Sequence, residues 1–257
     1  MVPPHLNTSS GAVEPSLPDR GEEQAAVSPD ILLSGFTHDL RSPLFAVLGY
    51  LQLLQRSLEI SGPEKALAYV RQARDAGLRL DQMVTEMLDL LRFDQGPITL
   101  QREAVSVSTL FQRLWNTFGV IAQNKQVNLR MILKDDEALT AQADFRLLER
   151  ALDNLIGNAI KFSFPGGEVI VIGQRIHHGV AFEVADRGCG IPAEAHGRIF
   201  EPFAQVRNSD HPMGYGMGFG MGLAIVKFIA KAHQGEVSVS SVPGQGSHFT
   251  FWIPDRP

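Results

Sequence analysis

The chain has 257 residues, of which 44% are hydrophobic and 20% charged, a composition typical of a folded protein and not of a disordered or fibrous one. Its net charge of -5 at pH 7 supplies no basic surface for nucleic acid, so we expect no nucleic-acid partner. Cys189 is the single cysteine, which excludes an intramolecular disulfide and a Cys-rich zinc site and fits a reducing cytoplasm. No uncharged apolar run approaches the roughly 18 residues that span a bilayer, and the first residues lack a signal-peptide pattern, so we predict a cytoplasmic protein without membrane insertion.

The first 95 residues predict a tail followed by two helices. Residues 1–27 mix Pro, Ser, Gly and Glu with few large apolar side chains, so this segment is expected to be disordered. Apolar residues then recur every three or four positions over 33–58 and again over 67–91, which is the spacing of one helical face. The Ser-Gly-Pro sequence at 61–63 separates the two runs, so residues 28–95 predict an antiparallel helical hairpin.

A hairpin of two helices buries one face of each helix and is marginally stable by itself. Two such hairpins form a four-helix bundle, so we expect a homodimer built on residues 28–95. The alternative, that the second apolar stripe packs against the C-terminal part of the same chain, stays open.

Residues 96–257 alternate strand and helix signals and predict an α/β sandwich, so the fold class of the whole chain is α+β. Strands are expected at 98–103, 127–133, 168–176, 180–185, 236–242 and 247–253, and helices at 106–123, 144–162 and 222–234. The segment from Gly188 to Gly220 is rich in glycine without a sustained period, which is typical of a long functional loop and similar to a nucleotide lid.

Five short segments carry the residues on which a functional interpretation depends. The chain lacks a P-loop, the strict dinucleotide-binding glycine spacing and the motifs of Ser/Thr/Tyr kinases. The five segments are 36–44 (FTHDLRSPL), 153–162 (DNLIGNAIKF), 186–192 (DRGCGIP), 200–203 (FEPF) and 218–227 (GFGMGLAIVK). In this order they resemble the H-box, N-box, first glycine box, F-box and second glycine box of bacterial two-component sensor histidine kinases, and the resemblance covers about residues 30–254.

The resemblance implies that ATP phosphorylates His38 and that the phosphoryl group then passes to an Asp of a response regulator. A histidine is nucleophilic when neutral, and an ordinary pKa of about 6.5 leaves it mostly neutral at cytoplasmic pH. The Asp39 carboxylate can accept one ring N–H and leave the other nitrogen free to attack. Ser42, one helical turn beyond His38, can orient the water that hydrolyses a regulator's aspartyl phosphate. Pro43 predicts a bend in this helix.

Asn154, Asn158 and Lys161 fall at helical spacings of four and three, so they share one face of the helix expected over 144–162. Mg²⁺ prefers oxygen ligands and keeps several waters, so the Asn158 carbonyl oxygen and the triphosphate oxygens form a plausible shell, with Lys161 neutralising phosphate charge. ATP-hydrolysing relatives have Glu four residues before the metal Asn. Asn154 at that position favours phosphoryl transfer over hydrolysis.

The first glycine box places Asp186 after an apolar strand, and the resemblance assigns its carboxylate to the exocyclic amine of adenine. Glycines in the two glycine boxes let the backbone approach the base and the phosphates. Phe200 and Phe203 are expected to anchor the lid in the core. The whole nucleotide-binding set implied by the resemblance is Asn154, Asn158, Lys161, Asp186, Gly188, Gly190, Phe203, Gly218, Gly220 and Gly222.

Two positions depart from the family pattern. Ser42 stands where Thr or Asn is more usual, which puts the strength of any phosphatase activity in doubt. Gln234 stands where Gly often ends the helix before the last strands. Cys189 lies beside the expected adenine site and is read as an inert buried thiol, with a reactive thiol as the alternative.

Three other functions stay open at this stage. The chain is alternatively a response-regulator phosphatase that seldom phosphorylates itself, a non-catalytic dimeric scaffold, or a kinase of the same ATPase fold that phosphorylates Ser on another protein. The intact motifs argue against the scaffold, and the hairpin that carries His38 argues against the Ser kinase. No sensor segment is visible, so a separate sensor protein is a possible partner.

Overall fold

The computed structural model describes residues 43–54, 63–94, 99–134, 138–205 and 220–255. Residues 43–54 are helical, and helix α2 spans Pro63–Asp94, so the two helices expected in the N-terminal part are confirmed where they are described. Within the described ranges, no helix is long and apolar enough to cross a membrane.

The C-terminal part is a mixed α/β unit, as expected. After α2 the elements follow in the order β1 (Arg102–Ser106), α3 (Val107–Asn124), β2 (Asn128–Leu133), β3 (Thr140–Asp144), α4 (Phe145–Phe162), β4 (Glu168–Ile176), β5 (Gly179–Asp186), η1 (Ala193–Ala195), α5 (Gly222–Ala232), β6 (Glu236–Val242) and β7 (Gly246–Pro254).

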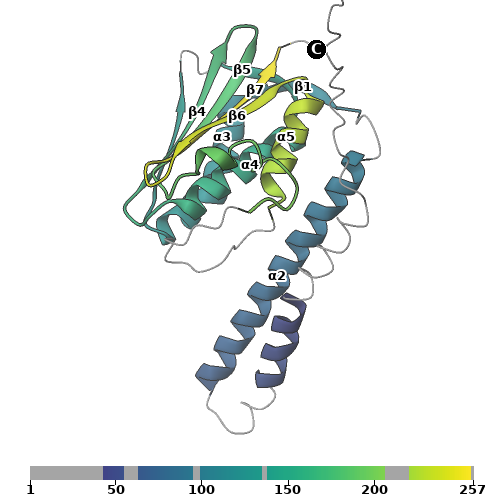
Figure 1. The fold of residues 1–257 in the computed structure, drawn as a ribbon, viewed down its shortest axis with the longest axis vertical. Helices are drawn as coiled ribbons and strands as arrows, with labels where there is room; N and C mark the ends of the chain where they lie inside the picture. The colour runs from purple at the N-terminus through teal and green to yellow at the C-terminus, as the bar shows by residue number, and fades with distance from the viewer. Residues whose placement is uncertain (1–42, 55–62, 95–98, 135–137, 206–219, 256–257) are drawn as a thin grey trace, which may run out of the picture. The chain divides into compact units, whose positions relative to one another are not determined.

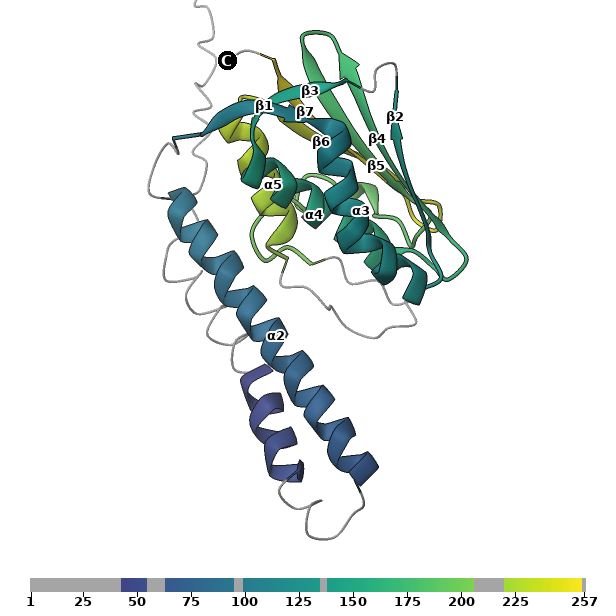
Figure 2. The ribbon, with the colours of Figure 1, turned by 180° about the vertical axis from the view of Figure 1, so that it is seen from behind.

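The strands form a five-stranded sheet in the order β2-β4-β5-β7-β6 and a two-stranded sheet of β1 and β3. In the larger sheet β2 and β4 are parallel and the other neighbours are antiparallel. Helices α3, α4 and α5 cover one face of this sheet, which is seen most directly from behind (Figure 1, Figure 2). Each helix therefore needs one apolar face, and the sequence periodicity supplies it.

The core lies between these helices and the sheet. Phe182 on β5 is fully buried and lies 6.4 Å, ring centroid to ring centroid, from both Phe111 on α3 and Phe251 on β7. Its tilted and edge-to-face contacts join the helical layer to the centre of the sheet. Other fully buried side chains come from α3, α4 and α5: Leu110, Leu114, Leu148, Leu152, Leu155, Ile156 and Ile225.

The clearest departures from the sequence prediction are the boundaries of two elements and one additional strand. Strand β1 begins at Arg102 and not near residue 98, and α5 ends at Ala232 and not at 234. Strand β3, with the sequence TAQAD, was not predicted because it has few apolar or β-branched side chains. Its hydrogen bonds to β1 hold it in an extended conformation.

Helices α3 and α5 are each followed, one residue after the C-cap, by a glutamine in the left-handed region, since φ is 58° at Gln126 and 59° at Gln234. After α5, Gln234 N–H donates to the Lys231 carbonyl at 3.0 Å and Gly235 N–H donates to the Ala230 carbonyl at 2.8 Å. This pair of hydrogen bonds is a Schellman motif, in which glycine is the favoured left-handed residue. The left-handed backbone at residue 234 therefore explains why glycine is more usual than glutamine at this position.

We predict that Gln234→Gly raises the free energy of unfolding by about 1 kcal/mol, because glycine adopts a positive φ without a Cβ clash. The matched control is Gln123→Gly in the last turn of α3, which lowers that free energy by about 0.5–1 kcal/mol because φ there is helical. Urea unfolding of both variants provides the measurement. A loss of stability in Gln234→Gly would contradict this account.

Candidate functional site

Helix α4 carries the polar face expected to bind phosphates. Asn154, Asn158 and Lys161 are half-buried, and all lie within the regular helix, so their spacing places them on one face. The Asn154 side-chain amide donates to the Arg150 carbonyl at 2.9 Å, which fixes the orientation of that side chain. The Lys161 ammonium lies 4.7 Å from the centroid of the Phe162 ring, a cation–π contact.

The N-terminal end of α5 lies against this face of α4. A Cβ atom on Gly222, the first residue of α5, would lie 2.5 Å from Asn154 Oδ1. Glycine is therefore required at 222 while the Asn154 amide keeps its orientation. The structure thus brings together one residue of the predicted N-box and one of the predicted second glycine box.

The segment after β5 lies against the C-terminal end of α4. A Cβ atom on Gly188 would lie 2.2 Å from the Phe162 carbonyl oxygen, and Ser163 forms an isolated β-bridge with Gly188. Cys189 N–H also donates to the Phe162 carbonyl, at 3.4 Å. These contacts place Asp186, two residues before Gly188, near the end of the helix that carries Lys161.

Asp186 is a buried carboxyl group at the end of β5, with 9% of its surface exposed. Its Oδ1 atom accepts a hydrogen bond from Gly188 N–H at 2.8 Å. Burial raises the pKa of the Asp186 carboxyl from 3.8 to about 6, although hydrogen bonds from Gly188 and Ser247 favour the charged form. A buried carboxylate with one oxygen held by the backbone suits the recognition of a ligand N–H group.

The first glycine box makes a tight turn against Val242, the last residue of β6. Gly190 has a φ of 67°, and a Cβ atom there would lie 2.1 Å from the Val242 carbonyl oxygen. Both the positive φ and the close backbone approach require glycine at this position.

The predicted F-box and second glycine box meet at the backbone. A Cβ atom on Gly220, whose φ is 71°, would lie 2.5 Å from the Ala204 carbonyl oxygen and 2.6 Å from the Phe203 carbonyl carbon. Phe203 itself has a φ of 63° and is half-buried. Phe200 lies edge-to-face on Phe249 at 6.4 Å between ring centroids, which confirms that this side chain packs against the core.

Two further charged groups near α4 were not predicted from the sequence. Lys125, which follows α3, donates through Nζ to the carbonyl oxygens of Ile160 and Lys161, and burial lowers its pKa. Asp153 lies on α4 itself, where burial, reinforced by the negative charge of Glu149, raises the pKa of its carboxyl to about 6. The hydrogen bonds of Lys125 and the raised pKa of Asp153 could not be read from the local sequence, because both depend on residues that folding brings together.

Four predicted site residues lie outside the described residues: His38, Asp39, Ser42 and Gly218. For the metal, the described part of the chain contains no group of three or more His, Cys, Asp or Glu side chains that could hold an ion. The half-buried Asn158 amide oxygen on α4 is a hard neutral donor next to Lys161, and such a donor fits an ion held mostly by phosphate and water oxygens.

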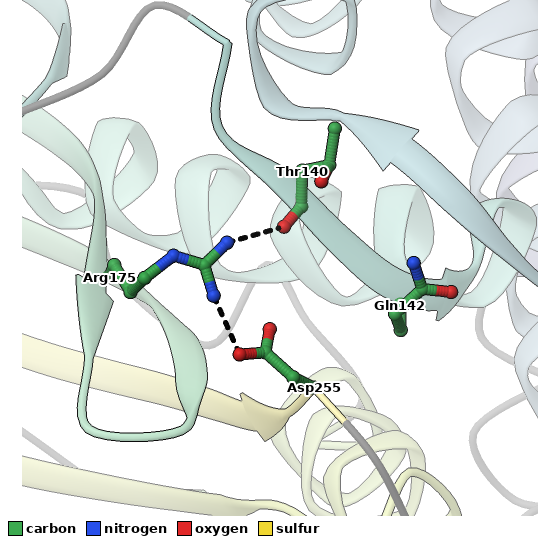
Figure 3. Close-up of a pocket in the computed structure, with 4 residues that line it drawn as sticks. All are labelled: Thr140, Gln142, Arg175 and Asp255. Atoms are coloured by element: carbon green, nitrogen blue, oxygen red, sulfur yellow. Dashed lines mark hydrogen bonds and ion pairs between the residues drawn. The ribbon is translucent and has the colours of Figure 1, made fainter.

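A separate hollow lies at the opposite end of the sheet from Asp186 and is lined by Thr140, Gln142, Arg175 and Asp255 (Figure 3). Arg175 is already engaged there, since Nη1 lies 2.6 Å from Asp255 Oδ2 and Nη2 donates to the Thr140 carbonyl at 3.3 Å. The hollow contains none of the predicted site residues. We therefore assign the candidate site to α4, the end of β5 and the start of α5.

Two family models match this chain. The model described as "His Kinase A (phospho-acceptor) domain" matches residues 30–96, and the model described as "Histidine kinase-, DNA gyrase B-, and HSP90-like ATPase" matches residues 143–257.

Among curated proteins, the circadian input-output histidine kinase CikA of Synechococcus elongatus is 33% identical over 225 residues, which are 87% of this chain and 30% of CikA. Drug sensory protein A of Synechocystis sp. is 32% identical over 232 residues, which are 86% of this chain and 34% of that protein. The chain therefore spans about a third of the length of these relatives.

Solved structures agree with these matches. Full-length ShkA in complex with AMPPNP has a TM-score of 0.64 and 30% identity, covering 89% of this chain and 46% of ShkA. Histidine kinase ThkA in complex with response regulator protein TrrA has a TM-score of 0.69 and 21% identity, covering 88% of this chain and 61% of ThkA. The second likeness concerns the fold alone.

We predict that Asp186→Asn raises the free energy of unfolding by about 1–3 kcal/mol at pH 7.5 and by less at pH 5. The folded pKa of about 6 lies above the ordinary 3.8, so the stability contributed by Asp186 is fully present below pH 3.8 and is lost as the pH rises through 6. Asparagine cannot ionise, so the variant does not lose stability as the pH rises. Its amide oxygen can still accept the hydrogen bond from Gly188 N–H.

The measurement is denaturant unfolding of both proteins at the two pH values. Asp81→Asn, at an exposed position on α2, is the matched control and changes stability equally at both. An Asp186→Asn effect that is the same at pH 5 and pH 7.5 would rule out a buried ionised carboxylate.

Proposed function

Because the chain belongs to the two-component sensor histidine kinase family, we propose that it transfers the γ-phosphoryl group of ATP to its own His38 and then to an Asp of a response regulator. The observation that carries the proposal is the convergence of Asn154, Gly222 and the Asp186 segment around α4. Domain bounds of 28–95 for the phosphoacceptor hairpin and 96–257 for the ATPase part belong to the same proposal.

The residues around α4 divide the work of holding ATP. The Asp186 carboxylate accepts a hydrogen bond from the exocyclic amine of adenine, while Gly220 and Gly222 let phosphates approach the N-terminal end of α5, where backbone N–H groups point outward. Lys161 neutralises phosphate charge. The Asn158 oxygen takes one position in the shell of a Mg²⁺ ion, which when bound offsets the negative charge of the triphosphate.

The transfer step forms an N–P bond at His38 and breaks the bond between the γ-phosphorus and the β,γ-bridging oxygen, so ADP leaves. His38 attacks as the neutral imidazole, and the ring acquires positive character as the bond forms. Asp39 accepts the other ring N–H and stabilises that charge. The protein must neutralise the negative charge of the triphosphate, and it must align the attacking His38 nitrogen with the leaving oxygen.

Exposed apolar residues of the helical part support a homodimer. Leu44, Leu48 and Leu51 recur along residues 43–54 at one helical face and expose 45–47% of their surface. On α2, Leu78 exposes 61% and Leu88 exposes 49%. A second copy of the chain would cover these side chains in a four-helix bundle and present a docking surface for the regulator. Because the reaction consumes ATP, we place these domains in the cytoplasm.

We predict that His38→Gln abolishes labelling by [γ-³²P]ATP but leaves ATP affinity unchanged, because the acceptor and the nucleotide site belong to different domains. The wild-type label is expected to be acid-labile and base-stable, as a phosphohistidine is. His178→Gln, at an exposed histidine, is the matched control and labels normally. Labelling of His38→Gln at the wild-type rate would show that another residue is the acceptor.

Asn158→Ala is expected to weaken Mg²⁺-dependent nucleotide binding on the order of 10- to 100-fold, because it removes a metal ligand. The measurement is calorimetric titration with ADP, once with Mg²⁺ and once with EDTA. Asn116→Ala, on the exposed face of α3, is the matched control. If Mg²⁺ strengthens ADP binding to Asn158→Ala as much as to the wild type, Asn158 is not the metal ligand.

We predict that Asp39→Asn slows autophosphorylation by about 10² to 10⁴-fold, the range of general-base assistance. Ser42→Ala keeps autophosphorylation within a few-fold of the wild-type rate but removes regulator dephosphorylation, and Ser42→Thr preserves or raises that dephosphorylation. The measurement is the rate of each reaction with purified protein and its regulator. Equal loss of both rates in Ser42→Ala would mean that Ser42 acts through the helix structure and not through its hydroxyl.

A further inference from the structure

A buried histidine joins the end of α5 to the start of α4, far from the nucleotide-binding ends of both helices. His233 is the C-cap residue of α5 and has no exposed surface. Its Nε2 atom lies 3.0 Å from Asp144 N–H, and its Nδ1 atom lies 2.8 Å from the Ile229 carbonyl oxygen. Asp144 is the N-cap residue of α4, so one imidazole connects the two helix ends.

The partners of the ring dictate its protonation state. A carbonyl oxygen accepts hydrogen bonds, so Nδ1 carries the proton toward Ile229, and a backbone N–H donates, so Nε2 is unprotonated toward Asp144. His233 is therefore neutral. Protonation of Nε2 would turn the Asp144 contact into two opposed donors and leave the buried N–H of Asp144 without an acceptor.

The charges around His233 come from two elements. The Arg102 guanidinium on β1 donates to the His233 carbonyl at 3.1 Å, and the Asp144 carboxylate lies at the start of α4. Burial lowers the pKa of His233, Arg102 lowers it further, and the hydrogen bond to Ile229 and the charge of Asp144 act in the opposite direction. Protonation would thus place a buried positive charge beside the Arg102 guanidinium.

The side chain of Asp144 also holds the chain that enters the ATPase part. Gln101 N–H donates to Asp144 Oδ2 at 3.1 Å, and the Asp144 Oδ1 atom accepts from the N–H groups of Arg146 and Leu147. The Asp144 carboxylate therefore joins the first residues before β1 to the first turn of α4.

Two contacts fix α4 against α5 along their length. Asp144 and Asn154 lie ten residues apart on one helix, and Gly222 and His233 lie eleven apart on the other, which are rises of about 15 Å and about 16.5 Å. Because Asp144 meets His233 and Asn154 meets Gly222, the helices run antiparallel with matched spans. A slip of either helix would break one contact or drive Gly222 into the Asn154 amide.

We propose that His233 is a positioning residue for ATP binding: its neutral, Nδ1-protonated ring holds α5 in register with α4, so that the glycines at the start of α5 meet the asparagine face of α4. This inference rests on the proposed nucleotide site. His233 touches no nucleotide and acts through the helix pair. Because nucleotide binding and the neutral ring favour the same arrangement, each strengthens the other by thermodynamic linkage.

The test uses the whole chain and ADP with Mg²⁺. Nitrogen-15 NMR of the imidazole rings across a pH titration, with and without saturating ADP, gives the tautomer and pKa of His233. The expected result is the Nδ1-protonated neutral ring at pH 7 and a pKa that falls further when ADP binds. A His233 pKa that ADP leaves unchanged overturns the inference, while an absence of ADP binding overturns the nucleotide site itself.

Two variants provide an independent arm. In His233→Gln the Oε1 atom can reach the position of Nε2 and accept a hydrogen bond from Asp144 N–H, and an amide does not titrate. ADP affinity therefore stays close to that of the wild type at pH 7.5, and it falls less than that of the wild type when the pH is lowered to 5.5. In His233→Asn the shorter side chain cannot reach Asp144, and ADP affinity falls roughly tenfold at temperatures where the protein is folded. Wild-type affinity in folded His233→Asn, or an equal loss in the two variants, overturns the inference.

Discussion

Helix α4 is held at both ends by groups that satisfy its unpaired backbone atoms, and the geometry of the candidate site depends on this. At the N-terminal end the Asp144 carboxylate accepts from Arg146 N–H and Leu147 N–H. At the C-terminal end the Lys125 ammonium donates to the Ile160 and Lys161 carbonyls. An acid at the first end and a cation at the last end also match the helix dipole.

The contacts around α4 and in the neighbouring loops explain why glycine occupies each position of the two glycine boxes that the structure describes. Gly188 is required because the Phe162 carbonyl fills the space of a Cβ atom, and Gly222 leaves room for the Asn154 amide in its observed orientation. Gly190 and Gly220 are required also by their positive φ angles. Gly188 and Gly222 allow two separate stretches of chain to lie against α4, which is what a site built from sequence-distant residues needs.

Much of this arrangement could be predicted from the sequence because the apolar periodicity is strong. Strands β4 and β6 lie at the predicted bounds, 168–176 and 236–242, and the first glycine box follows a strand as expected. Strand β3 could not be predicted, since TAQAD becomes a strand through its pairing with β1. The roles of Lys125 and His233 could not be predicted either. His233 and Asp144 are 89 residues apart, and nothing local indicates their contact.

If the proposed function is right, a nucleotide held by α4 and α5 phosphorylates the histidine of the N-terminal hairpin. The most direct measurement is mass spectrometry of peptides from the protein incubated with ATP and Mg²⁺, analysed before and after mild acid. The expected result is one phosphoryl group on the peptide that contains His38, assigned to its imidazole, lost in acid and retained in base. An acid-stable phosphoryl group on a Ser or Thr, or no phosphoryl group on a protein that binds ATP, would contradict it.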